Sequence, residues 1–360
     1  MLDHLRRPAT LLIATLLPTS LALAACGGGD DDMLEGLDAV TVSGEPGTTP
    51  NLDWKGRLKP EKAESTVVEK GDGAALKEGD VVRVDFTVAN GWTHEEHFSS
   101  YDATGLSVLV TVGTEKEPQS VTDLLATGFA GQIKPGQTLG SRIAVTAGSD
   151  VVFGDYLATQ AATLLASLDI GNEDGLLFVA DLTALAQPAG TAQKAPGWAP
   201  AIVEKDGVPT GLDFAGAATP SGTLQVATLV KGDGPVVRSG QTILASYLGQ
   251  VWKGKKPFDE SYSTGRGLEA VVGGQAASVV KGWSQGLVGL PVGSRVILQI
   301  PPKLGYGNKA QGDIPAKSTL YFVVDILDAA DPEPTPEPTP AATETPAETP
   351  SDTASPSPSD

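Results

Sequence analysis

The sequence predicts an α+β fold built twice in tandem, each copy a curved antiparallel β-sheet wrapped on a short α-helix. Runs of β-branched and apolar residues bounded by Gly or Pro predict strands at 224–230, 241–251, 293–300 and 319–327. Between them, apolar residues spaced by three and four over 278–290 predict one face of a short helix. A helix packed on an antiparallel sheet is an α+β arrangement.

The doubling is indicated by an internal repeat. Lys70-Gly-Asp-Gly73 recurs as Lys231-Gly-Asp-Gly234 at an offset of 161, and Gly140-Ser-Arg142 recurs as Gly293-Ser-Arg295 at 153. A nearly constant offset of this size is too long for a solenoid unit and indicates a duplicated domain. Other pairs that keep a similar offset are Leu52-Asp-Trp54 with Leu212-Asp-Phe214, and Phe153-Gly154 with Tyr306-Gly307.

Residues 1–25 have the pattern of a cleavable signal peptide. Two arginines precede an apolar run that is too short to cross a bilayer and ends in small residues. Leu23-Ala-Ala-Cys26 resembles the bacterial lipobox, which predicts cleavage before Cys26 and attachment of acyl chains there. The alternative is an ordinary secreted protein with a chance cysteine.

Composition predicts three segments outside the folded copies. Residues 26–62 begin Gly-rich and acidic and are expected to be the lipidated N-terminus and a flexible tether. Residues 188–221 contain several prolines and are expected to be a linker, and 330–360 a disordered Pro/Thr/acidic tail. The folded copies are then expected at 63–187 and 222–329.

Charge and cysteine content exclude several classes of function. The formal net charge of −19 disfavours a nucleic-acid partner. The single cysteine allows no internal disulfide and no multi-cysteine zinc cluster. His94 and His97 are spaced by three rather than by the four of a HExxH motif, so a solvated loop is expected there. We expect no metal and no cofactor.

Aromatic residues gather in one stretch of a chain that has only 5% of them. Between 247 and 322 they fall in order beside one carboxylate and two valines, which predicts the lining of a small apolar ligand pocket. Taken singly, several of these would be core residues, but buried hydroxyls and a carboxylate need partners. The set comprises Tyr247, Phe258, Asp259, Val279, Val280, Trp283, Tyr306 and Phe322.

This ordered set resembles the FKBP-type peptidyl-prolyl cis-trans isomerases over residues 222–329. The resemblance implies that each copy is an FKBP-like domain and that the second is an active isomerase. The motifs that carry it are Gly232-Asp-Gly234, Tyr247-Leu-Gly249, Phe258-Asp259, Val279-Val-Lys-Gly-Trp283, Gly289-Leu-Pro-Val-Gly293, Tyr306-Gly307 and Ile314-Pro315.

The resemblance also implies a role for each residue. Tyr247, Asp259 and Tyr306 would be catalytic, with Asp259 held by the Tyr247 hydroxyl. The Tyr306 hydroxyl and the Val280 backbone N–H would hold substrate carbonyls. Leu268 stands where the family usually has an aromatic wall, and Gly274–Ser278 is longer than usual. The implied substrate-binding residues are Phe258, Leu268, Val279, Val280, Trp283, Ile314 and Phe322.

These residue types suit prolyl isomerisation on physical grounds alone. Rotation about a peptide bond costs about 18–20 kcal/mol because it breaks amide resonance. The twisted carbonyl carries less negative charge than the planar one, so an apolar site favours it, and placed donors hold its neighbours. Lowering the barrier by about 7 kcal/mol would give roughly a 10⁵-fold rate gain.

The first copy lacks most of these groups. The aligned residues keep apolar bulk but lose both tyrosine hydroxyls, the carboxylate and the indole. We expect a degenerate domain that folds but is weakly active or inactive; the alternative is a pocket respecialised for another ligand. The alignment places Phe86 for Tyr247, Phe98-Ser99 for Phe258-Asp259, Leu125 for Trp283, Phe153 for Tyr306 and Phe178 for Phe322.

The sequence therefore predicts an exported, lipid-anchored prolyl isomerase that assists folding at the outer face of the cytoplasmic membrane. Its expected partners are proline-containing unfolded or exported proteins, the membrane through the N-terminal lipid, and macrolide inhibitors of the family. One alternative is a non-catalytic chaperone or peptide-binding lipoprotein that uses the same pocket. Another is a β-rich surface scaffold with no pocket.

Overall fold

The computed structural model describes residues 33–59, 62–158, 161–171 and 174–332. The predicted signal peptide, Cys26 and nearly all of the predicted tail lie outside these residues. We call residues 33–185 the first lobe and residues 190–330 the second lobe. No helix in the described ranges is both long and apolar enough to cross a membrane.

The first lobe is built on an antiparallel sheet whose inner face carries alternate apolar side chains. Along strand β6 (Val81–Asn90), Val82, Val84, Phe86 and Val88 are fully buried on that face, as the two-residue period of a strand requires. In order across the sheet the strands are β5 (Glu64–Glu69), β9 (Arg142–Gly148), β10 (Gly175–Leu185), β6 (Val81–Asn90) and β7 (Glu96–Ser99), with β8 (Val108–Thr111) also paired to β6.

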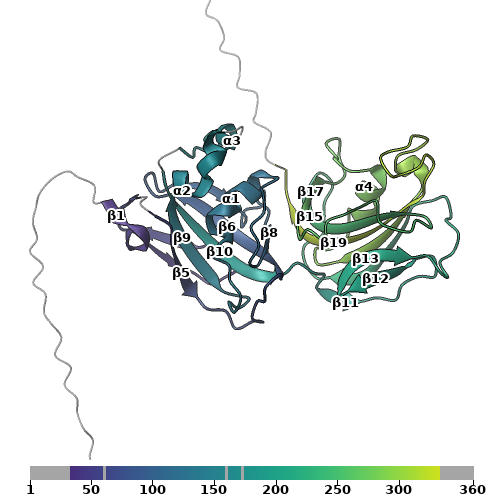
Figure 1. Ribbon diagram of the computed structural model, residues 1–360, viewed down its shortest axis with the longest axis horizontal. Helices are drawn as coiled ribbons and strands as arrows, with labels where there is room; N and C mark the ends of the chain where they lie inside the picture. The colour runs from purple at the N-terminus through teal and green to yellow at the C-terminus, as the bar shows by residue number, and fades with distance from the viewer. Residues whose placement is uncertain (1–32, 60–61, 159–160, 172–173, 333–360) are drawn as a thin grey trace, which may run out of the picture. The chain divides into compact units, whose positions relative to one another are not determined.

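Helix α1 (Val121–Ala130) packs against the inner face of this sheet (Figure 1). It begins at Ser120, whose side chain accepts a hydrogen bond from the Asp123 backbone N–H at 3.1 Å and so caps the first turn. Leu124, Leu125 and Phe129 face the sheet and are buried with it. The helix thereby closes one core.

The segment that follows β9 forms additional helices. Leu165 and Ile170 from this segment are buried in the same core. The elements are α2 (Ser149–Phe153), η2 (Gly154–Ala158) and α3 (Ala161–Ser167).

The second lobe has the same strand order with one strand added at the edge. Its helix α4 (Lys281–Leu287) contacts β18, and a short η3 turn (Pro302–Leu304) follows that strand. The predicted antiparallel sheets with few helices are therefore present. Across the sheet the strands are β11 (Gly190–Ala192), β14 (Gln225–Gly232), β18 (Arg295–Ile300), β19 (Leu320–Ala330), β15 (Thr242–Val251) and β16 (Asp259–Glu260), with β17 (Leu268–Val271) also paired to β15.

The outer face of the first sheet is covered by a hairpin that precedes it in the chain. Strands β2 (Val40–Ser43) and β3 (Asn51–Trp54) pair with each other and pack on Ala144, Leu177 and Val179. Before them in the chain, η1 (Gly36–Ala39) follows β1 (Met33–Glu35), which pairs in parallel with β4 (Arg57–Lys59). The prediction that 26–62 is a flexible tether is therefore wrong for 33–59, because its alternating apolar residues bury against the sheet.

A second hairpin covers the outer face of the second sheet in the same way. Strands β12 (Ala201–Lys205) and β13 (Val208–Asp213) pack on a cluster around Tyr321. The Gln250 side-chain amide bonds both the N–H and the carbonyl of Leu212, at 2.9 and 3.1 Å. The segment 188–221, predicted to be a linker, therefore contains folded structure: it forms β11 and this hairpin. The Leu-Asp-aromatic repeat at 52–54 and 212–214 marks the two hairpins.

A buried ion pair ties the first hairpin to its sheet. Arg142 on β9 and Asp181 on β10 are register partners, and two hydrogen bonds of 2.8 Å join the guanidinium to the carboxylate. Both side chains are essentially inaccessible to solvent. Tyr101 donates to the same carboxylate at 2.7 Å, and the Gly47 backbone N–H donates to it at 2.6 Å.

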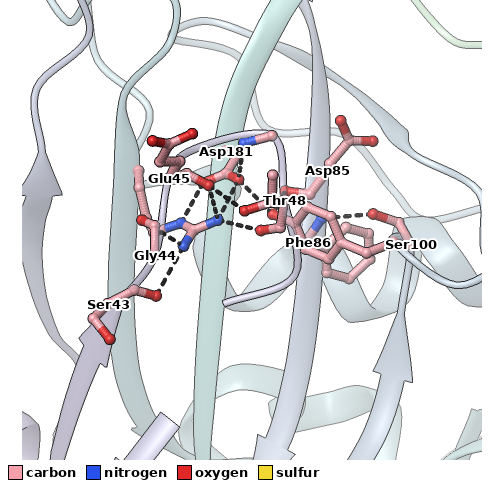
Figure 2. Close-up of polar contacts among 11 residues, drawn as sticks. Ser43, Gly44, Glu45, Thr48, Asp85, Phe86, Ser100 and Asp181 are labelled. Carbon is pink, nitrogen blue, oxygen red and sulfur yellow. Dashed lines mark hydrogen bonds and ion pairs between the residues drawn. The ribbon is translucent and has the colours of Figure 1, made fainter. Parts of the chain in front are cut away.

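The remaining guanidinium donors are satisfied by backbone carbonyls of the loop between β2 and β3. Figure 2 shows Ser43, Gly44, Glu45 and Thr48 gathered beside Asp181; the carbonyl oxygens of all four accept from Arg142. A buried charge is tolerated only when its polar atoms are paired in this way.

The second lobe repeats the pair with a different third partner. Arg295 and Asp325 are register partners joined by bonds of 2.7 and 2.8 Å, and Asp325 is fully buried. Burial raises the pKa of Asp325, while its hydrogen bonds to Arg295 act in the opposite direction. Arg295 also donates to the Glu204 carboxylate on β12 at 2.8 Å. Each lobe thus fixes its hairpin through one arginine of the sheet.

Replacing Arg142 by Met is expected to destabilise the protein by about 3–5 kcal/mol, because Asp181 and the loop carbonyls lose their buried partner. The measurement is urea unfolding followed by circular dichroism. The control is Lys256→Met, which removes an exposed ion pair with Asp313 and should cost about 1 kcal/mol or less. Equal stabilities for the two variants would contradict the structural role of Arg142.

Candidate functional site

The centre of the second lobe's inner face is the indole of Trp283, which is 2% exposed. It lies on α4, in the first turn after Val280. Its ring meets those of Phe322 and Tyr247 edge-to-face, with centroids 5.3 and 5.6 Å apart. These are favourable geometries for aromatic pairs, so the three rings form a rigid apolar floor.

Gly249 allows two further rings to meet beside this floor. The rings of Phe258 and Phe322 lie edge-to-face at 5.6 Å; Phe322 is the register partner of Gly249 on β19, and Phe258 directly precedes β16 on the other side of Gly249. A Cβ atom at Gly249 would approach both rings to 2.6 Å, so no larger residue fits there without displacing them. A glycine inside a strand often marks such a close approach. In the sequence Gly249 is marked only as part of the Tyr247-Leu-Gly249 motif, and that motif alone does not reveal the contact with the two rings.

The polar groups of the site come from Tyr247 and Asp259. The Tyr247 hydroxyl donates to the Asp259 carboxylate at 2.6 Å. Burial, and after it the hydrogen bond to this carboxylate, raise the pKa of Tyr247, so the phenol stays protonated at neutral pH. Asp259 itself is exposed at the mouth of the site. A carboxylate is thus fixed beside the apolar floor.

Tyr306 is the most exposed of the predicted site residues, at 39%. It lies in a turn closed by bonds from the Gly307 N–H to the Pro302 carbonyl and from the Lys317 N–H to the Gly307 carbonyl. Its hydroxyl is therefore accessible to a ligand.

The remaining predicted residues belong to the same apolar cluster. Ile314 is buried, whereas Leu268, Val279 and Val280 are half-buried and pack on the cluster that holds Trp283. Within the described residues, the Val280 backbone N–H has no recorded acceptor. The structure thus brings the predicted apolar residues together and leaves part of their surface open.

The arrangement offers an apolar surface with a few polar groups around it. It presents one fixed carboxylate, one exposed phenol and one backbone N–H. No group of three or more His, Cys, Asp or Glu within the described ranges could hold a metal ion. The site can bind an apolar ring and accept or donate hydrogen bonds to the peptide groups on either side of it.

The corresponding place in the first lobe is filled. Phe86, Phe129 and Phe178 are fully buried, and Phe129 contacts both of the others, at 4.9 and 6.4 Å between centroids. Trp283 makes the equivalent contacts in the second lobe, so Phe129 rather than Leu125 is its counterpart. The alignment of Leu125 with Trp283 was wrong. The Gly-aromatic dipeptides 128–129 and 282–283 were the signal that could have corrected it.

Two further residues close the first lobe's site. Val88 is the register partner of Phe178, as Gly249 is of Phe322, and its buried side chain occupies the space that the glycine leaves open. Phe153, aligned with the exposed Tyr306, is fully buried and is followed by the added helices. The first lobe therefore keeps the sheet but replaces the open apolar floor by core packing.

The second lobe is similar to proteins of a known family. A family model described as FKBP-type peptidyl-prolyl cis-trans isomerase matches residues 234–327. An FK506-binding protein of Streptomyces anulatus is 37% identical over 118 residues, which are 32% of this chain and 93% of that relative.

Two further matches cover a similar share of this chain. The isomerase FkpA of Escherichia coli is 35% identical over 113 residues, 31% of this chain and 40% of that relative. The crystal structure of AtFKBP13 is 36% identical, covers 30% of this chain and 93% of that one, and has a TM-score of 0.27. The chain belongs to the FKBP-type peptidyl-prolyl cis-trans isomerase family.

Proposed function

We propose that the second lobe isomerises Xaa-Pro bonds in exported proteins at the outer face of the cytoplasmic membrane. The observation that carries this proposal is the Tyr247–Asp259 hydrogen bond of 2.6 Å beside the apolar floor around Trp283. It places a fixed carboxylate next to a surface that suits a pyrrolidine ring.

The proposed reaction requires no covalent intermediate. The proline ring packs on Trp283 between Phe258 and Phe322, where water is excluded from the twisting amide. The twisted amide carbonyl carries less negative charge than the planar one, so removing water from the amide costs the twisted state less free energy than the planar state. The barrier between them therefore falls. Val279, Val280, Leu268 and Ile314 would extend the apolar wall.

Polar groups hold the substrate while the amide turns. The Val280 N–H and the Tyr306 hydroxyl would each donate to a carbonyl of the bound segment. Asp259, oriented by Tyr247, would lie beside the amide. Because these groups fix the peptide units on either side of the proline, part of the energy of binding the segment stabilises the twisted amide and lowers the barrier.

The first lobe is proposed to be a second, degenerate FKBP-like domain that serves as a spacer or binding module. Support comes from the equal strand orders of the two sheets and from the repeat offsets in the sequence. Val88, Phe129 and Phe153 fill its site, which leaves no apolar floor for a proline ring. Catalysis would then come from the second lobe alone.

The proposed location rests on the N-terminal sequence. The lipobox-like Leu23-Ala-Ala-Cys26 supports cleavage and lipidation at Cys26, which would hold the protein on the extracytoplasmic membrane surface. The relatives named FK506-binding proteins support a further part of the proposal, that macrolides of the FK506 type compete for this site.

The catalytic assignment is tested by Asp259→Ala and Tyr306→Phe in the chain without its leader. Asp259→Ala, which removes the carboxylate, is expected to lower kcat/KM on an Xaa-Pro test peptide about 10- to 100-fold. Tyr306→Phe, which removes the hydroxyl, is expected to lower it about 2- to 10-fold. Glu260→Ala, which removes the neighbouring carboxylate that bonds Ser263, is the matched control. An unmodified protein that shows no acceleration would favour the non-catalytic chaperone instead.

Gly249→Val should close the second lobe's site as Val88 closes the first. The added side chain would displace Phe258 and Phe322, so isomerase activity and macrolide binding should both fall at least about tenfold. The measurement pairs the activity assay with calorimetric titration of FK506. Retained activity in a folded variant would show that proline does not bind between these rings.

Membrane attachment is tested by Cys26→Ser in a bacterium that processes lipoproteins. The unmodified chain should fractionate with membranes and release only with detergent, because two or more acyl chains anchor durably. The variant should appear in the soluble extracytoplasmic fraction. Equal fractionation of the two proteins would contradict the lipid anchor.

A further inference from the structure

The second lobe is positively charged in an acidic chain. Residues 190–330 contain ten lysines and three arginines against ten acidic residues, whereas the whole chain has a formal net charge of −19. Charge asymmetry of this kind within one chain favours attraction between its parts when they come within about a Debye length. The positive lobe is the one with the open site.

Several of these lysines flank the site. Lys281 directly follows Val280 at the start of α4, and Lys309 and Lys317 donate backbone N–H bonds to the Tyr306 and Gly307 carbonyls. All three side chains are exposed, and within the described part of the chain no ion pair is recorded for them. They are therefore available to an acidic ligand.

The segment 333–360 has the complementary composition. It contains six acidic residues, no basic residue and eight prolines, so it carries eight Xaa-Pro bonds, the bond type on which the family acts. Glu344-Thr-Pro346 is repeated as Glu348-Thr-Pro350. Each of these triplets places a carboxylate two residues before a proline.

The segment starts at a fixed distance from the site. Strand β19 carries Phe322 near its beginning and ends at Ala330, about 26 Å away at the usual strand rise. The next residue, Asp331, is held by Arg238 and Gln241. From Ala330 a chain can extend at most about 14 Å to Pro334 but about 55 Å to Pro346. The Xaa-Pro bonds at Pro334 and Pro336 are too close to Ala330 to span about 26 Å, so only those from Pro338 onward can reach the site.

We propose that the Xaa-Pro bonds around Pro346 and Pro350 occupy the second lobe's site within the same molecule, with Lys281, Lys309 and Lys317 pairing their carboxylates. The proposal rests on the isomerase function assigned to that site. A ligand tethered over this distance has an effective concentration on the order of millimolar, so even a weak Xaa-Pro ligand competes with substrate. The segment acts as a built-in competing substrate.

Exchange spectroscopy on the labelled chain without its leader tests this directly. Free Xaa-Pro bonds interconvert in about tens to hundreds of seconds. Signals of Ala347 and Ser351, which follow Pro346 and Pro350, should show cis-trans exchange at least about 100-fold faster, and Asp259→Ala should slow them. Signals next to Pro334, which cannot reach the site, should keep the uncatalysed rate and serve as the internal control.

Kinetics provide a second readout. Replacing Pro346, Pro350, Pro356 and Pro358 by Ala should raise kcat/KM on a test peptide about two- to tenfold at ~50 mM salt. The gain should disappear at ~500 mM salt, and also when Lys281, Lys309 and Lys317 are replaced by Gln, because both changes weaken the charge attraction. Replacing Pro334 alone should change nothing.

The outcomes separate this inference from the function on which it rests. An active chain whose exchange near Pro346 is uncatalysed, and whose activity is unchanged by the proline replacements, overturns the inference alone. A chain without activity in both forms overturns the isomerase assignment. Acceleration that depends on protein concentration would show binding between molecules and would overturn the intramolecular proposal.

Discussion

The interaction on which both lobes depend is an arginine buried against an aspartate of the neighbouring strand. Burying a guanidinium costs several kcal/mol unless every donor finds an acceptor. Arg142 meets that requirement with Asp181 and four loop carbonyls, whereas Arg295, whose side chain is 12% exposed, donates to Asp325 and Glu204. In both cases the acceptors include the hairpin that precedes the sheet. The hairpins are therefore structural parts of the lobes, and each sheet is covered on both faces.

This framework is separate from the chemistry that one lobe carries. The strand order and the buried ion pair occur in both lobes, on the side of the sheet opposite the helix. The inner faces differ by a few side chains: Val88 for Gly249 and Phe129 for Trp283 replace an open floor by a packed core. Because all of these side chains are apolar and buried, the first lobe still has a packed core, but the space that the glycine leaves open in the second lobe is occupied. Stability and binding can thus change independently in this architecture.

The sequence predicted which aromatic side chains lie together in the second lobe better than it predicted the boundaries of the folded segments. Tyr247, Trp283 and Phe322 could be placed together because aromatic residues are rare in this chain and occur there in an ordered pattern. The hairpins over 33–59 and 201–213 were missed because Gly, Pro and acidic residues hid their short apolar alternation. Their burial depends on the outer sheet face, which no local pattern reveals. The arginine was visible in the Gly-Ser-Arg repeat, but its buried partner lies on another strand and was found only in the structure.

Arg142 holds the loop between β2 and β3 through backbone atoms, and this determines which parts of the loop sequence can vary. The guanidinium recognises main-chain oxygens of 43–48 rather than side chains, so the identities of most loop residues are physically unconstrained. What the loop must retain is its path, which has positive φ at Gly44 and Gly47. Distant members built on this plan could share no recognisable letters in the hairpin. They would be recognised by their backbone conformation: two glycines with positive φ, three positions apart, in a loop whose carbonyl oxygens face an arginine of the sheet.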